Sequence, residues 1–182
     1  MNTHEDPTPE SVAQLANQVF SELHQTIISH ESGSLDGNVE SVHDMRVAIR
    51  RFRVALSNFA VCFPPKARKG LLVKLKNLAD ALGGVRDMDV MIAAMKTSLR
   101  TSSGGEESTI SALIRRLRAR RRSRLRVLRN YLRGEEYAGF KHEFSFEKLN
   151  EDLLAPANVQ PEANETREVI HETIKEEHGQ AA

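Results

Sequence analysis

The sequence has no tryptophan, a single cysteine and no long run of apolar residues. With only Cys62, no disulfide can form within the chain, and the apolar segment 59–63 around it predicts a small buried side chain. A membrane-spanning helix needs about 18 apolar residues in a row, so none is expected. The polar N-terminus lacks a signal-peptide pattern, and we expect a cytoplasmic protein.

The usual motifs of catalysis are also missing. The sequence has neither a GxxxxGK[ST] phosphate loop nor an HExxH zinc motif, and Cys62 has no plausible partner base nearby. His171 and His178 lie seven residues apart, which is a weak signal for a metal site. The sequence therefore predicts a protein that is not an enzyme and has no catalytic residue, metal site or cofactor.

Acidic residues are scarce in the middle of the chain, although the formal net charge is only +1. Residues 43–133 hold 22 Lys and Arg against 6 Asp and Glu, a net charge of +16, and the rest of the chain carries −15. This segregation predicts a basic surface flanked by acidic ends, and hence an anionic partner. The alternative, that the charges only solvate helices, does not account for so large an excess.

Apolar residues recur at helical spacing, and no segment shows a β pattern. The first predicted helix begins at Pro9 after Thr8 as N-cap and buries a stripe that includes Leu15. Ser41 is predicted to cap the second helix, and the glycines at 83–84 to end the third. The predicted helices span 9–30, 41–62, 66–82, 86–100 and 106–133, with a turn-rich break at 31–37 and a sixth helix from 135 whose core includes Tyr137 and Phe140.

These elements predict an all-α fold, an antiparallel four-helix-bundle-like domain of long amphipathic helices. The domain is expected to span residues 9–155, after an N-terminal tail at 1–8. Residues 156–182 form an acidic linker and tail with few large apolar residues, which predicts a frayed helix or a disordered segment.

One segment, residues 42–54, combines a cationic face with an apolar face. A guanidinium group makes bidentate, charge-assisted hydrogen bonds with phosphate, so a row of arginines a turn apart suits a polyanion. For the histidine of the row, a structural role at the start of the helix is the alternative. On a helix the row occupies a sector of about 80° and consists of His43, Arg46, Arg50 and Arg53.

A second cationic stripe runs along the predicted helix at 106–133. Packed against the first row, it would line a groove for an extended anion, with Lys74 at the rim, whereas the alternative is a solvated face. Arg121 and Arg124 fall on the apolar side, where a buried guanidinium needs a partner or a wet cavity. The stripe consists of Arg115, Arg118, Arg122, Arg126, Arg129 and Arg133.

Arg86, Asp87 and Asp89 follow the two glycines, at the predicted start of a helix. Acidic side chains are favoured there because they cap the first turn and offset the positive end of the helix dipole. The alternatives are that Asp87 and Asp89 bind a cation or orient nearby arginines.

The segments VHDMRVAIRRFR at 42–53 and LGGVRDMDV at 82–90 resemble, in order and separation, the two motifs of the CHAD family, the conserved histidine α-helical domain. The resemblance covers residues 10–155. It implies a helical fold of two pseudo-symmetric four-helix halves around a basic cavity, and binding of inorganic polyphosphate, in some members beside triphosphate tunnel enzymes. The anion-binding positions that it implies are His43, Arg46, Arg50, Arg51 and Arg53. Arg86 and Asp87 match the second motif, for which a structural or a mixed role is the implication.

By the same resemblance the chain corresponds to one half of the usual domain. Full-length members carry a second His-x-x-Arg helix, and neither His142 nor His171 begins such a motif. A second copy of the chain would then complete the cavity as a homodimer, or the cavity is open and binds more weakly.

The sequence thus predicts non-enzymatic binding of inorganic polyphosphate by a cytoplasmic protein, with association to polyphosphate granules as an option. A nucleic-acid-binding helical protein is an alternative, although no aromatic residues are interleaved with the basic ones for base stacking. Another is an accessory or granule-associated module that presents polyphosphate to a phosphate-processing enzyme. The candidate polyphosphate-binding residues are His43, Arg46, Arg50, Arg51, Arg53, Lys74, Arg86, Arg115, Arg118, Arg122, Arg126 and Arg129.

Overall fold

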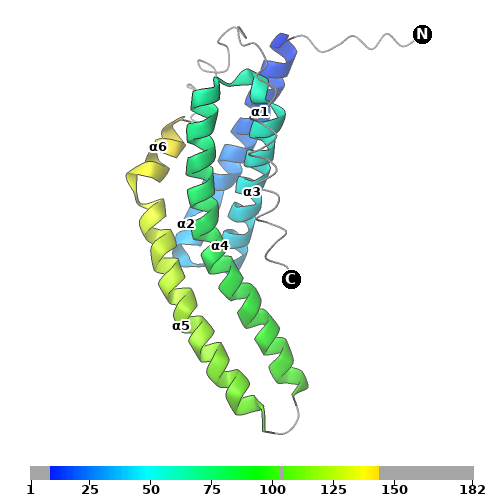
Figure 1. Ribbon diagram of the computed structural model, residues 1–182, viewed down its shortest axis with the longest axis vertical. Coiled ribbons are helices and arrows are strands. Elements are labelled where there is room, and N and C mark those ends of the chain that lie inside the picture. The colour runs from blue at the N-terminus through cyan, green and yellow to red at the C-terminus, as the bar shows by residue number, and fades with distance from the viewer. Residues whose placement is uncertain (1–8, 103–104, 144–182) are drawn as a thin grey trace, which may run out of the picture.

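All regular structure in the computed structural model, which describes residues 9–102 and 105–143, is helical (Figure 1). Within these ranges the chain is an all-α helical bundle, as the periodicity predicts. The elements are α1 (Pro9–Ser29), α2 (Glu31–Asp36), α3 (Val39–Asn58), the 3₁₀ helix η1 (Ala60–Cys62), α4 (Pro65–Thr101), α5 (Glu107–Leu132) and α6 (Glu135–Glu143).

The prediction that the glycines at 83–84 end a helix is wrong, because α4 runs unbroken from Pro65 to Thr101. Figure 1 shows that α4 changes direction near its middle. A Cβ added to Gly83 would lie 3.1 Å from Nη1 of Arg46 in α3, and one added to Gly84 would lie 3.2 Å from Cδ of Arg124 in α5. The two glycines therefore allow arginines of both neighbouring helices to approach α4 closely.

The segment 31–37, which is predicted to be a turn-rich break, is mostly helical. It forms the six-residue α2, which ends at Gly37, whose φ of 81° is the left-handed conformation that glycine adopts without steric cost. Asn38, rather than Ser41, is the N-cap of α3, and its side chain accepts a hydrogen bond from the Ser41 N–H at 3.0 Å. Helix α3 ends at Asn58, before the predicted end at residue 62, and η1 follows it.

The core is centred on phenylalanines of α1 and α3. The Phe20 ring lies 5.1 Å from Phe52 and 5.2 Å from Phe63, measured between ring centroids. The stripe predicted for α1 is rotated, because Phe20 is fully buried while Leu15 is 54% exposed. Burying an aromatic ring removes more apolar surface from water than burying a leucine, so Phe20 sets the rotation of the helix. Cys62 is half-buried at the edge of this core, and burial raises the pKa of its thiol.

Helix α6 packs on the core and on α2. Tyr137 and Phe140 are buried, as predicted. The Tyr137 hydroxyl donates a hydrogen bond to Oε2 of Glu31 at 3.2 Å. Nζ of Lys141 forms an ion pair with Oε1 of Glu31 at 3.1 Å and lies 5.0 Å from the centroid of the Tyr137 ring. These contacts hold the end of the described chain against the bundle. The predicted acidic tail lies outside the described residues.

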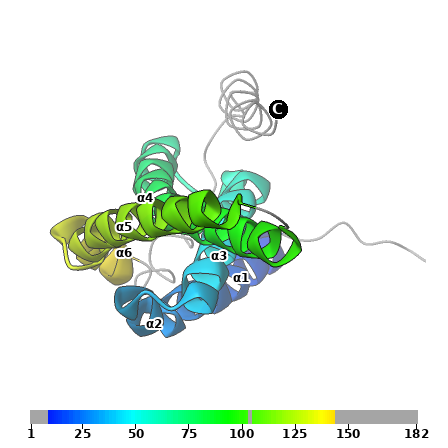
Figure 2. The same cartoon turned by 90° about the horizontal axis from the view of Figure 1, so that it is seen from below.

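Helices α4 and α5 pair along their length. Figure 2 shows them side by side across one side of the molecule, with α1 and α2 on the other side. The lower parts of the two helices extend past α1, α2 and α3 (Figure 1). Arg121, which pairs with Asp89, still reaches the Gly37 carbonyl at the end of α2. We call residues 90–102 and 105–120 the hairpin arm.

Candidate functional site

The rotation of α3 turns its predicted cationic row outward. Met45, Ile49 and Phe52 are fully buried, so the opposite sector of the helix faces the surface. We call His43, Arg46, Arg50, Arg51 and Arg53 the α3 basic face. Within it, His43 and Arg53 are half-buried, and the other three arginines are exposed.

Arg46 lies along the seam between α3 and α4. Its Nη1 donates to the carbonyl oxygen of Ala79 at 3.4 Å, and the guanidinium passes over Gly83. Because this contact uses one nitrogen of a five-donor group in an exposed residue, the guanidinium is oriented by α4 and can still bind an anion. Gly83 of the second motif thus positions Arg46 of the first.

Arg50 and Arg51 line a groove of about 650 Å³ between α1 and α3. The α1 side contributes Val19, Glu22, Leu23 and Thr26, and the α3 side contributes Val47, Arg50, Arg51, Val54, Ala55, Asn58 and the neighbouring Phe59. We call this surface the α1–α3 groove. It combines cationic side chains with an apolar wall.

The candidate residues of α4 are half-buried. They are Lys74 and Arg86, and the Lys74 carbonyl accepts a hydrogen bond from the Tyr131 hydroxyl of α5 at 3.0 Å. Because α4 is continuous, Arg86, Asp87 and Asp89 lie in the middle of a helix and not at its start. The prediction that the two aspartates cap a helix is therefore wrong.

Asp89 orients an arginine, which was one of the alternatives for this residue. Its carboxylate accepts from Nε of Arg121 and, at 3.3 Å, from Nη2, while Nη2 also donates to the Gly37 carbonyl at 2.8 Å. Arg121 thus has the partner that its place on the apolar side requires. Asp87 is exposed, and so is Arg124, whose Cδ packs near Gly84.

The arginine stripe of α5 faces outward and toward α2. Arg129 is half-buried, and its Nε donates a hydrogen bond to the Leu35 carbonyl at 2.7 Å. The last carbonyls of a helix have no partner within it, so this cation provides a donor for the last turn of α2. The remaining candidates of this stripe, Arg115, Arg118, Arg122 and Arg126, are exposed.

The two predicted rows do not line one common groove. Helix α4 lies between α3 and α5 and packs on both (Figures 1 and 2). Arg46 marks the α4 side of α3, whereas Arg129 places the α5 stripe on the side of α2. The structure therefore gives two cationic surfaces, one on α3 and one on α5.

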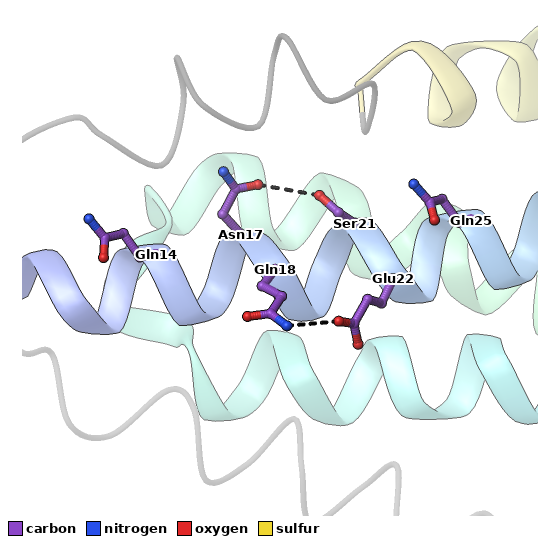
Figure 3. Close-up of a pocket in the computed structure, with 6 residues that line it drawn as sticks. All are labelled: Gln14, Asn17, Gln18, Ser21, Glu22 and Gln25. Atoms are coloured by element: carbon purple, nitrogen blue, oxygen red, sulfur yellow. Dashed lines mark hydrogen bonds between the residues drawn. The ribbon is translucent and has the colours of Figure 1, made fainter.

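A second depression, of about 290 Å³, lies on the outer face of α1. Figure 3 shows that only α1 contributes to it, with Gln18 donating to Glu22 at 2.9 Å and Ser21 to Asn17 at 3.4 Å. It has no cation and one carboxylate, so it does not suit a polyanion.

Other kinds of site have little support in the described part of the chain. Among its residues, no three His, Cys, Asp or Glu side chains gather as metal ligands would. None of its helices is both long and apolar enough to cross a membrane. Its aromatic side chains are all buried or half-buried, so none presents an exposed ring for stacking.

The structure defines the class of fold, and the match to a family model then defines the family. The fold is an all-α bundle with cationic helix faces and a close glycine contact between two motifs. The CHAD domain model matches residues 18–181, and the chain belongs to the CHAD domain family. Comparison with curated proteins finds no match.

Sequence reasoning missed the apolar wall beside Arg50 and Arg51 and the approach of Arg124 to α4. Val47 and Val54 flank these arginines in the sequence, outside the predicted core sector, which is a readable signal for an exposed apolar patch. The signal for the approach of Arg124 is the pair of glycines at 83–84 inside an otherwise continuous apolar periodicity. Such a pair indicates either the end of a helix or a place where another helix packs closely against it.

Proposed function

We propose that the chain binds inorganic polyphosphate through the α3 basic face and does not catalyse a reaction. The observation that carries this proposal is the outward row of cations on α3, with Arg46 oriented by Ala79 and Gly83. Successive phosphates of an extended polymer can meet cations spaced about a turn, or 5.4 Å, apart along the helix. Membership of the CHAD family supports the same ligand, in line with the resemblance of the two motifs.

The exposed α5 stripe is a second surface for the same polymer. Because α4 separates it from α3, a chain of phosphates has to cross α4 to reach both surfaces. The exposed arginines there add electrostatic attraction, which weakens with salt as counterions are released. Storage, sensing or presentation of polyphosphate to a phosphate-processing enzyme, in the cytoplasm or at granules, are roles that this binding would serve.

Nucleic acid is the alternative ligand, and the positions of the aromatic side chains favour polyphosphate over it. Proteins that bind single strands commonly stack bases on exposed aromatic rings. In the described part of this chain, the phenylalanines and tyrosines instead pack into the core and its edges. A polymer of phosphates needs no such rings.

Competition between long-chain polyphosphate and single- or double-stranded nucleic acid, at about 150 mM salt, tests the ligand. We expect polyphosphate to displace nucleic acid, and preference for nucleic acid contradicts the proposal. Arg46→Ala with Arg50→Ala should lower polyphosphate affinity by about a hundredfold or more, because each charge-assisted hydrogen bond contributes about 1.5–3 kcal/mol and the variant loses at least two. The matched control is Arg116→Ala with Arg120→Ala, an exposed pair of the same spacing on α5. Equal losses in the two variants would place the binding site elsewhere.

We infer that the hairpin arm packs against a second copy of the chain in a homodimer. Val90 and Met91 of α4 are 51% and 48% exposed, and Leu113 of α5 is 42% exposed, on a part of the chain beside which no other described helix lies. A second copy would cover these side chains and complete the two-half cavity implied by the resemblance.

Light scattering should give a dimer mass that Val90→Asp lowers to that of a monomer, while Val73→Asp, at a site 53% exposed in the bundle part of α4, does not. A monomeric mass with full polyphosphate affinity rules the dimer out.

A further inference from the structure

The α1–α3 groove has an apolar wall that polyphosphate cannot use. Val54 is 53% exposed, and Val19, Leu23 and Val47 are half-buried beside Arg50 and Arg51. Phosphate oxygens can bind the guanidinium groups, but they cover none of this apolar surface. The groove instead fits a ligand that carries both carboxylates and aliphatic side chains.

The chain carries a segment of this chemistry outside the described residues. Residues 162–178 contain six glutamates against Arg167 and Lys175, and Val169, Ile170 and Ile174 lie among them. The whole stretch 144–182 has nine Asp and Glu against three Lys and Arg. Its charge is thus opposite to that of the α3 basic face.

We propose that residues 162–178 of the same chain bind in the α1–α3 groove and cover Arg50 and Arg51. The glutamates pair with the two arginines, and the aliphatic residues cover Val47 and Val54. Glu22, which also lines the groove and accepts a hydrogen bond from Gln18 at 2.9 Å, meets Arg167 or Lys175 of the segment.

The end of the described chain lies beside the helices that form the groove. The Phe140 ring of α6 lies 5.9 Å from Phe52 of α3 and 5.8 Å from His24 of α1. The residues between Glu143 and residue 162 span up to about 60 Å when extended, and α1 is only about 30 Å long. The tether therefore reaches every part of the groove, and it keeps the segment at a high effective concentration there.

The consequence for ligand binding rests on the proposed polyphosphate function. If the segment covers Arg50 and Arg51, it competes with polyphosphate for the α3 basic face. A long polymer with many phosphates would displace it, whereas short phosphates with few charges would not. The segment would then select for chain length.

Disulfide trapping in the full-length chain tests the docking without polyphosphate. In a Cys62→Ser background, Val54→Cys is paired with Ile170→Cys and exposed to a mild oxidant. The matched control pairs Val73→Cys with Ile170→Cys, because Val73 has the same 53% exposure but lies on α4. We expect the position-54 pair to form an intrachain disulfide about tenfold faster, the ratio that a preference of about 1.4 kcal/mol gives. Equal rates, or disulfides only between two chains, overturn the proposal.

A charge variant provides a second, independent measurement in the native-cysteine chain. Replacing Glu165, Glu168, Glu172 and Glu176 with glutamine should raise the affinity for polyphosphate severalfold, because the competing segment loses its charge. An unchanged affinity contradicts the competition. A chain that binds no polyphosphate but still cross-links at position 54 supports the docking and overturns the proposed function.

Discussion

At the scale of the residue, Asp89 and His24 show two ways in which the bundle accommodates a polar side chain in its interior. Asp89 is 8% exposed, and its carboxylate is neutralised by Arg121, which also bonds the Gly37 carbonyl. His24 packs against Phe140, and burial, with a smaller contribution from the Lys141 charge, lowers the pKa of its imidazole below 6.5. Burial therefore favours the neutral form of the His24 imidazole.

Removing one partner of the Asp89–Arg121 pair should destabilise the fold. Asp89→Ala leaves a guanidinium whose side chain is only 18% exposed without its counterion, and we expect a loss of about 3 kcal/mol in the free energy of unfolding. Asp87→Ala, at an exposed neighbouring site, should change it by less than about 0.5 kcal/mol. Urea denaturation measures both, and equal effects would show that the ion pair does not stabilise the junction of the hairpin arm.

Protonation of His24 should couple folding to pH. Since the folded pKa lies below that of the unfolded chain, the unfolded state binds more protons below pH 6.5, and stability falls as the pH decreases through this range. The free energy of unfolding should therefore fall more steeply between about pH 7 and 5 in the unchanged protein than in His24→Gln. His142→Gln, at an exposed site, serves as the control and should keep the original slope. Identical slopes for His24→Gln and the unchanged protein would contradict this assignment.

At the scale of the element, helix starts could be predicted from the sequence, whereas the continuity of α4 through its two glycines could not. Pro9, and the starts of α5 and α6, agree with local signals, because capping and helix propensity act within a few residues. The continuity of α4 could not be derived locally. It depends on Arg46 and Arg124, which lie far away in the sequence and pack where a Cβ is missing.

The same distinction applies to the candidate site. Helical spacing predicts that the cationic row of α3 lies away from the core, since the buried sector of Met45, Ile49 and Phe52 is set by local apolar periodicity. The relation of that face to the α5 stripe depends on which helices pack together. Arg129 bonds the carbonyl of Leu35 on α2, a contact between residues 94 positions apart that no local pattern encodes.

Two glycines of α4 should respond differently to alanine. A Cβ on Gly70 meets nothing within 4 Å, so Gly70→Ala should raise the free energy of unfolding by about 1 kcal/mol through helix propensity. Gly83→Ala gains the same propensity, but its Cβ would lie 3.1 Å from Nη1 of Arg46 and displaces that guanidinium. We therefore expect a smaller gain in urea denaturation, together with weaker polyphosphate binding. A full gain with unchanged binding would show that Arg46 does not depend on Gly83.

At the scale of the whole molecule, like charges gather on one part of the bundle. The segment 115–133 contains ten arginines and no acidic residue, and the exposed Arg118, Arg122 and Arg126 follow one another four residues apart along α5. Like charges four residues apart destabilise a helix by about 0.2–0.5 kcal/mol per pair. A polyanion that binds the folded chain relieves this repulsion, so ligand affinity and folding stability are linked.

Added salt should therefore stabilise this protein. Raising sodium chloride from about 0.05 M to 0.5 M screens the repulsion along α5, and the thermal midpoint should increase. Chloride is the appropriate anion, since sulfate and phosphate also strengthen apolar burial. Replacing Arg118, Arg122 and Arg126 with glutamine should raise the midpoint at low salt and reduce the gain from added salt. The matched lysine variant, which keeps the three charges, should retain that gain. A midpoint that falls with salt would mean that attractive ion pairs outweigh the repulsion in the folded chain.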